Sequence, residues 1–228
     1  MYKQLWLSIG LIGAGSLSGG TAQAQPTDTS FMDARLTLGL SGEREYEVST
    51  QNVTTISKSD LELTIGGGFT YVYKLIRYVG LGGQVGLLSW QSEAGDAADA
   101  DRSILLDFSA VAQGILPVVD SVEVYVSVPL GLTLNFLGET DAVGAQIGGV
   151  ASVTVDADVG VGFNFGLLVG VRLGLVAGVG LLAELGYVAH SFSHDITTEA
   201  MVLGFMGSTT TELDYSLGQL TMNLGAFF

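Results

Sequence analysis

Residues that could perform acyl-transfer chemistry lie together in the segment Ala189-His-Ser-Phe-Ser-His-Asp195. A His, a Ser and an acidic residue can form such a site, in which the imidazole activates the hydroxyl and the carboxylate orients the imidazole. The candidate pair in this segment is His190 and Ser193. The alternative is structural, with two neutral histidines in a loop and no catalytic role.

A second pattern with chemical meaning is Gly178-Val-Gly-Leu-Leu-Ala183, which matches the GxGxxA form of the dinucleotide-binding fingerprint. That fingerprint requires a strand before it and a helix after it, because the helix N-terminus faces the pyrophosphate. The residues from Leu181 to His190 instead alternate between two chemical types, as in a strand. We interpret these glycines as part of a turn, and no cofactor is predicted.

Acidic residues form two further clusters. They are Asp96, Asp99 and Asp101 in one segment, and Glu139, Asp141, Asp156 and Asp158 in another. Carboxylate oxygens are ligands for hard cations, but neither cluster has the spacing of an EF-hand loop. We interpret both as solvated loop carboxylates, and no metal site is predicted.

The composition narrows the classes of function. The chain has 228 residues, a formal net charge of −15 and no cysteine. A nucleic-acid partner is not expected, because phosphate binding needs clustered Lys and Arg. The absence of cysteine excludes a disulfide framework, Cys-ligated zinc and thiol catalysis.

The N-terminal segment has the three parts of a secretory signal peptide. Lys3 gives a basic start, an apolar run extends from Leu5 to about Ala14, and Ala22-Gln-Ala24 supplies small residues for cleavage. We predict a signal peptide over residues 1–24, followed by one domain over residues 25–228.

The elements that position these residues follow a period of two. In the stretch from Gly160 to Leu175, every residue on one face is large and apolar, while the other face holds the glycines, Asn164 and Arg172. A helix is disfavoured, because five glycines in 16 positions would cost about 1 kcal/mol each. The stretch is predicted to be a β-strand. Similar runs give eight strands, near residues 34–47, 61–74, 79–91, 104–116, 122–136, 160–175, 179–190 and 217–228.

The connections between these runs alternate in length. Short ones lie near residues 75–78, 117–121 and 176–178, and long polar ones near 48–60, 92–103, 138–159 and 192–216. Outer-membrane barrels have short periplasmic turns and long external loops. The sequence therefore predicts an all-β fold, an eight-stranded antiparallel up-and-down transmembrane β-barrel. Closure suits lipid because it leaves no strand edge unpaired.

The last strand ends in Phe228, and an alternating final strand with a terminal phenylalanine resembles the assembly signal of bacterial outer-membrane barrels. The chain as a whole resembles the small eight-stranded barrels of the OmpA, OmpX and OmpW type. This resemblance implies residence in the outer membrane. It also implies partners, namely the barrel-insertion machinery, outer-membrane lipid and lipopolysaccharide.

The histidine segment also resembles one eight-stranded outer-membrane family, the lipid A deacylases, which use a His and a Ser in the outer half of the barrel. That family carries His-x-Ser followed by an Asn-containing segment. Here Ser193 is three residues from His190 and the Asn is missing. The resemblance implies a lipid-modifying hydrolase only as a remote alternative.

The same period assigns side chains to the two faces of the barrel. An outward aromatic girdle is predicted from Tyr46, Tyr71, Tyr73, Phe136, Tyr187 and Phe228, with Arg44 as an outward charge. The inward charges are predicted to be Arg35, Glu43, Glu62, Lys74, Asp107, Glu123, Arg172 and Glu184. Charges in a confined interior must pair or meet water, so we expect a polar network that plugs the barrel. The alternative is that these charges line a conducting path.

Two segments suggest that the barrel projects above the membrane. The alternation around residues 151–159 extends beyond bilayer length, and residues 200–206 form an apolar run within a long connection. We therefore expect a structural or surface-interaction protein whose external loops carry any binding. A narrow channel or small-ligand conduit is the alternative.

Overall fold

The computed structural model describes residues 29–50, 53–61, 63–91, 102–137, 151–176, 178–202 and 205–228. The regular elements of this described part are ten β-strands. The same residues include no helix that is long and apolar enough to cross a membrane. The predicted signal peptide, Glu62 and the cluster Asp96–Asp101 lie outside the described residues.

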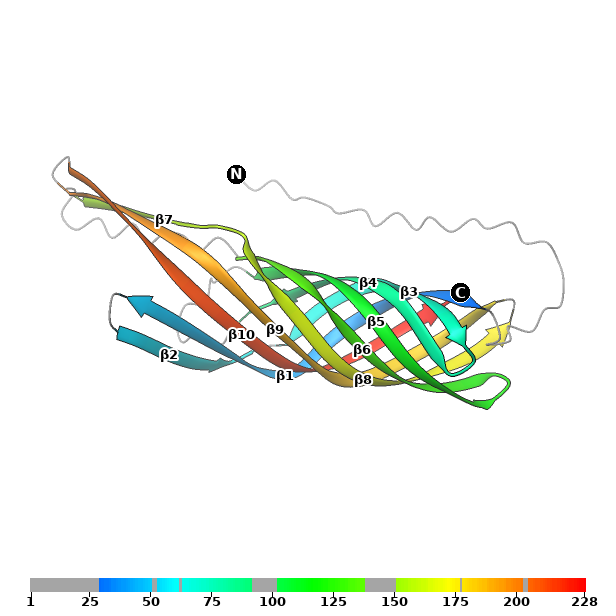
Figure 1. The fold of residues 1–228 in the computed structure, drawn as a ribbon. Coiled ribbons are helices and arrows are strands. Elements are labelled where there is room, and N and C mark those ends of the chain that lie inside the picture. Colours follow the sequence, from blue (N-terminus) through cyan, green and yellow to red (C-terminus); the bar gives the residue numbers. More distant parts are fainter. Residues whose placement is uncertain are drawn as a thin grey trace, which may run out of the picture.

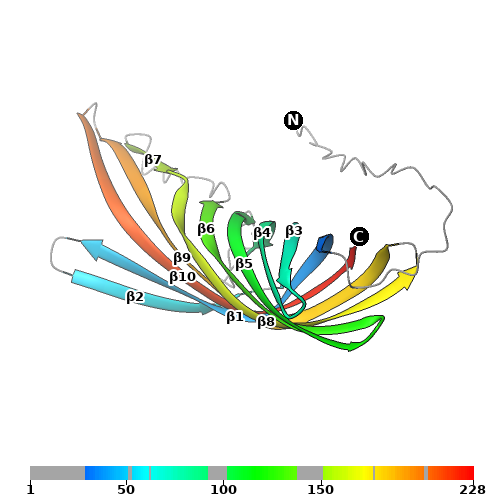
Figure 2. The ribbon, with the colours of Figure 1, turned by 45° about the vertical axis from the view of Figure 1, so that its right-hand side comes forward.

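Eight long strands form a closed antiparallel ring (Figures 1 and 2). They are β1 (Ser30–Thr50), β3 (Thr64–Ile76), β4 (Val79–Trp90), β5 (Ser103–Val119), β6 (Val122–Phe136), β8 (Gly160–Val176), β9 (Val179–Val202) and β10 (Phe205–Phe227). Each strand pairs with the next in this order, and β10 pairs with β1 to close the ring. The predicted eight-stranded up-and-down barrel is confirmed.

One end of the ring, here called the inner end, carries the C-terminus and the tight turns. Two residues separate β3 from β4, β5 from β6, and β8 from β9. Gly178 lies in the last of these turns with a φ of 78°, a conformation that favours glycine. Since β9 begins at Val179, the GxGxxA pattern belongs to a turn and a strand, as expected.

The opposite, outer end extends well beyond the ring (Figure 1). There β2 (Val53–Asp60) pairs with β1, and β7 (Ala151–Ala157) pairs with β9. The β9–β10 hairpin stays paired up to Val202 and Phe205. The long connections predicted near 48–60 and 192–216 are therefore mostly strands. They are rich in Thr, Ser and β-branched residues, which suit a pleated hairpin. The expected projection beyond the ring is confirmed.

The outward face of the ring is an apolar belt. On β8 the residues from Val161 to Leu175 alternate strictly, and the outward ones are highly exposed, with Phe163 at 67%. Comparable apolar residues are exposed on every ring strand, including Leu36 on β1 and Leu224 on β10. An apolar surface of this extent is unsuited to water and suits lipid. The ring is thus a transmembrane barrel.

Five of the six predicted girdle aromatics point outward. Tyr71, Tyr73, Phe136, Tyr187 and Phe228 are each at least 42% exposed. The side chain of Tyr46 lies outside the described part of the structure.

A β-bulge in β1 corrects two of the predicted orientations. The register with β10 shifts between Gly39 and Ser41, which exchanges the faces of the residues that follow. Arg44 therefore turns toward the lumen, with its guanidinium 6.0 Å from the ring of Trp90, and Glu43 is exposed. The predictions that Arg44 faces lipid and that Glu43 faces inward are wrong, because strict alternation does not anticipate the extra residue.

Candidate functional site: the barrel lumen

The centre of the inner half of the lumen is the carboxylate of Glu184 on β9. It forms an ion pair with Arg35 of β1. It also accepts hydrogen bonds from the Tyr125 hydroxyl and the Asn223 amide, both at 2.9 Å. Arg35 in turn donates to Asp33 at 2.6 and 2.8 Å. All these polar groups are buried, so each relies on the others to replace water.

A second ion-pair group lies closer to the inner end. Lys74 donates to Glu123 at 2.7 Å, and the Arg172 guanidinium lies 3.6 Å from the other oxygen of Glu123. Glu123 and Arg172 are direct cross-strand partners in the β6–β8 register. Arg172 also donates to the Gln113 side chain at 2.6 Å. Arg172 and Glu184 are not paired, because Gly170 is the residue of β8 opposite Glu184.

The Arg172 guanidinium is held between two aromatic rings. Its central carbon lies 3.9 Å from the ring centroid of Phe31 and 3.8 Å from that of Tyr125. Such cation–π stacking is strongest where water is excluded. Phe31 also belongs to a buried apolar cluster with Val72, Leu182 and Phe227. Charge and apolar packing together fill the inner end of the lumen.

Farther outward, Asp107 of β5 organises a separate polar group. Its carboxylate accepts hydrogen bonds from Thr133 at 2.5 Å and from the Asn164 amide at 3.2 Å, and it lies 3.0 Å from Nε2 of His190. Ser109 donates to the Asn164 side-chain oxygen at 2.7 Å. This group therefore links β5, β6, β8 and β9 across the lumen.

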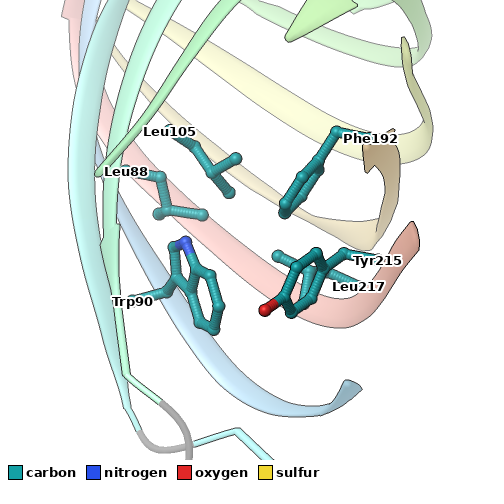
Figure 3. Packing of buried hydrophobic residues seen from close by; sticks show 6 residues of the cluster. All are labelled: Leu88, Trp90, Leu105, Phe192, Tyr215 and Leu217. Atoms are coloured by element: carbon teal, nitrogen blue, oxygen red, sulfur yellow. The ribbon is translucent and has the colours of Figure 1, made fainter. Parts of the chain in front are cut away.

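An apolar cluster, here called the outer cluster, lies inside the outer end of the lumen (Figure 3). Its residues come from opposite walls of the ring: Leu88, Trp90 and Leu105 on one side, and Phe192, Tyr215 and Leu217 on the other. The rings of Phe192 and Tyr215 stack with centroids 5.5 Å apart, and His194 meets both edge to face. Barrel interiors of eight strands are narrow enough for such side chains to meet.

The ion-paired side chains of the inner half, Asp33, Arg35, Lys74, Glu123, Arg172 and Glu184, are here called the inner network. A cavity of about 50 Å³ lies between this network and the outer cluster. Its wall includes Thr37, Gln84, Asp107, Ser109 and His190. One water molecule needs about 10–15 Å³ of such space, so the cavity has room for a few waters. The middle of the lumen is therefore polar and partly open, with ion-paired side chains on its inner side and apolar side chains on its outer side.

The structure brings most of the predicted lumen charges into contact, in two groups rather than one. Arg35 and Glu184 share the first, and Lys74, Glu123 and Arg172 share the second. Asp107 is in contact with neither group and instead accepts a hydrogen bond from Asn164. Glu62 lies outside the described residues.

Several side chains that hydrogen-bond the lumen charges were not predicted from the sequence. The unpredicted partners are Asp33, Gln113, Tyr125, Asn164 and Asn223. The alternation with a period of two could have identified Asp33 as inward-facing, because Asp33 lies two residues from Arg35 and therefore shares its face. For the neutral residues, the alternation indicates only that they face the lumen, and nothing in the sequence indicates which charges they contact.

The proposed catalytic pair is not formed. His190 is buried in the lumen, whereas Ser193 lies on the opposite face of β9 and donates to Asp214 at 2.6 Å. His194 also points inward, with Nδ1 donating to the backbone oxygen of Asp158 at 2.7 Å. The interpretation of two loop histidines is wrong too, because β9 continues through this segment and buries both rings.

The described part of the chain contains no group of three or more His, Cys, Asp or Glu residues close enough to hold one metal ion. Asp158 is exposed, and Glu139, Asp141 and the side chain of Asp156 lie outside the described residues.

No protein-family model and no curated protein sequence matches the chain. Its structure is similar to that of the outer membrane protein OprG from Pseudomonas aeruginosa, with 11% identity, a TM-score of 0.47, and coverage of 86% of this chain and 94% of OprG. Neisserial surface protein A matches with 13% identity, a TM-score of 0.37, and coverage of 86% and 96%. The outer membrane protein AlkL matches with 18% identity, a TM-score of 0.35, and coverage of 93% and 95%.

Proposed function

We propose that this protein is an outer-membrane β-barrel with a closed interior, whose role is structural or surface-interacting. The observation that carries the proposal is the filling of both ends of the lumen by different groups. Arg172 and its aromatic partners occupy the inner end, and Trp90, Phe192 and Tyr215 meet across the outer end. A solute would have to displace both sets of side chains to cross.

The surface-interaction part of the proposal rests on the outer extension. The hairpin of β9 and β10 stays fully paired far beyond the ring, and β1 with β2 forms a second hairpin beside it (Figure 2). A rigid, paired extension presents the same surface to any partner, so little conformational entropy is lost on binding. The chain would use these hairpins, rather than the lumen, to meet molecules outside the cell.

The proposal includes a route to the membrane. The segment 1–24 would direct export as a signal peptide, and the barrel-insertion machinery would recognise the strand that ends in Phe228. Phe228 is outward and more than half exposed, so its ring is accessible on the barrel wall. The apolar belt would contact outer-membrane lipid, including lipopolysaccharide.

Single-channel recording in planar bilayers tests the closed lumen. We expect no steady conductance from the refolded wild-type barrel, whose folded state is verified by heat-modifiable migration on gels. The double variant Glu184→Gln plus Arg172→Met, checked in the same way, reports whether the inner network contributes to closure. Reproducible wild-type currents that this variant alters would contradict the proposal.

A narrow conduit for small polar solutes is the second candidate, and the cavity beside Asp107 and His190 is the observation that favours it. Steady wild-type conductance would support this candidate. A lipid-modifying hydrolase has no such support, since His190 and Ser193 occupy opposite faces of β9. Loss of acyl chains from lipid A that disappears in His190→Ala would reinstate it.

A further inference from the structure

Arg102 is an exposed cation on the outward wall of the barrel, immediately before β5 at the outer end of the ring. Its guanidinium crosses the end of β4: Nε donates to the Ser89 hydroxyl at 3.0 Å, and Nη2 donates to the backbone oxygens of Leu63 and Ser89 at 2.9 and 3.3 Å. These partners are neutral, so they orient the guanidinium without neutralising its charge. Among the described residues, none accepts a hydrogen bond from Nη1. The planar group can therefore donate to a further, charged acceptor.

Arg102 lies at the outer border of the apolar belt. The next outward residue on β5 is Ile104, which is 41% exposed and pairs with Ser89 of β4. From Ile104 to Leu116, β5 covers roughly 30 Å of barrel height, at ~3.4 Å per residue and a tilt of ~40°. The hydrocarbon core of a bilayer is ~30 Å thick. Arg102 is thus at the depth where hydrocarbon ends and phosphate-bearing headgroups begin.

The outer extension has the opposite charge. Its strands carry the exposed carboxylates of Glu43, Asp60, Asp195, Glu212 and Asp214. Asp195 and Glu212 are direct cross-strand partners, so their like charges repel each other and would repel an anion. The exposed cation of this extension, Lys58, is already paired with Glu45. Within the described part of the chain, Arg102 is therefore the exposed cation at this border that is not engaged by a carboxylate.

We propose that Arg102 binds a phosphate group of lipopolysaccharide in the outer leaflet. Phosphate oxygens accept charge-assisted hydrogen bonds from a guanidinium, and arginine is the side chain best shaped for them. The site is continuous with the apolar belt, so the acyl chains of the same lipid would lie against Ile65, Leu87 and Ile104, all of them exposed. The inference rests on the proposed outer-membrane location. It adds the position and the chemical group by which the barrel would hold this lipid.

The inner end supplies a matched control. Arg77 is exposed in the turn between β3 and β4, with its guanidinium 5.8 Å from the ring centroid of Tyr78. It has the same charge as Arg102 and borders the same belt at the opposite end of the barrel. No acceptor among the described residues fixes its guanidinium by a hydrogen bond, so it lacks the preorganisation of Arg102.

Titration of the refolded barrel with lipid A in detergent, followed by native mass spectrometry, tests the site. Dephosphorylated lipid A is the reference, because it keeps the acyl chains and lacks the charge. We expect the wild type to bind lipid A about tenfold more tightly than the reference. Arg102→Met should abolish this preference, whereas Arg102→Lys should keep part of it, since the charge remains and the planar fork is lost. Arg77→Met should retain the preference in full. Heat-modifiable migration on gels verifies that each variant is folded.

A second measurement uses the wild type alone. In a barrel labelled with ¹⁵N-arginine, the Nε signal of Arg102 is expected to shift on addition of lipid A and to stay unchanged with the dephosphorylated lipid. Equal wild-type affinities for the two lipids, a preference that persists in Arg102→Met, or an Arg102 signal that does not respond would overturn the proposal. Failure of the proposed function is distinguishable, because its location is tested by fractionation of cells and its closed lumen by conductance, and neither readout depends on Arg102.

Discussion

The two halves of the lumen are packed by different kinds of side chain, although the same eight strands build both. The inner half contains ion-paired side chains that share partners. Glu184, for example, pairs with Arg35 and accepts hydrogen bonds from Tyr125 and Asn223. The outer half is filled by apolar and aromatic side chains such as Phe192 and Tyr215. Charges need their specific partners, whereas apolar side chains need mainly volume. The inner half should therefore be the less tolerant of substitution.

Glu184→Ala should give the largest effect, because it leaves Arg35, Tyr125 and Asn223 without their shared acceptor. Removing one partner from a buried ion pair costs about 3–5 kcal/mol. Urea unfolding of the barrel in lipid vesicles measures this loss. Glu212→Ala, which removes an exposed carboxylate from β10, should change the free energy of unfolding very little. A loss below 1 kcal/mol for Glu184→Ala would show that the inner network is not interlocked.

Phe192→Ala tests the outer half, where the expected loss is about 3 kcal/mol from the vacated volume and lost stacking. The matched control is Phe163→Ala on the lipid face of the neighbouring strand β8, where no packed cluster is disrupted. Phe192→Leu should restore most of the stability, because volume rather than a specific partner matters there. If Phe192→Leu were as damaging as Phe192→Ala, the contrast between the two halves would fail.

Gly178→Ala tests the tight turn at the inner end. A residue with a side chain at a φ of 78° is strained by about 1–2 kcal/mol. Gly178→Asn should be better tolerated, since Asn enters this conformation more readily than Ala. The same unfolding assay separates the two variants, and equal losses would argue against strain as the cause.

Lys58→Met should have no measurable effect on unfolding. Lys58 pairs with Glu45 at 2.6 Å on the outer extension, but the two side chains are 66% and 41% exposed. Exposed ion pairs contribute little because water and salt screen them. This pair has the same chemistry as Lys74 with Glu123 in the lumen, so Lys74→Met is the informative comparison. Equal effects of the two variants would mean that burial is not what makes the inner network important.

Most of the architecture could be predicted from the sequence, because a strand with one lipid face and one lumen face has a strict period of two. β8 shows this best, since every residue from Val161 to Leu175 takes its predicted face. The same rule fails after Gly39, where one extra residue in β1 exchanges the faces and turns Arg44 inward. A bulge leaves no compositional mark strong enough to see in one sequence.

The pairing of the lumen charges could not be predicted, although their inward direction could. Phase places Arg172 and Glu184 on the same side of the wall, but contact also depends on register and on the reach of each side chain. The register sets Arg172 beside Glu123, and the length of Arg35 carries it across to Glu184. Long side chains in a narrow interior make contacts that the order of the strands does not reveal.

The residue that follows β10 is joined to the first strand: Phe228 and Met32 exchange two backbone hydrogen bonds of 2.8 Å. Closure of the ring must therefore wait until β10 has reached the membrane, and such a topology folds slowly because the pairing of β1 with β10 joins residues so distant in sequence. The inner network depends on the same event, because Arg35 lies on the first strand and Glu184 on β9. Before closure, neither could enter hydrocarbon with its partner in place. Insertion and ring closure are thus expected to be a single cooperative step.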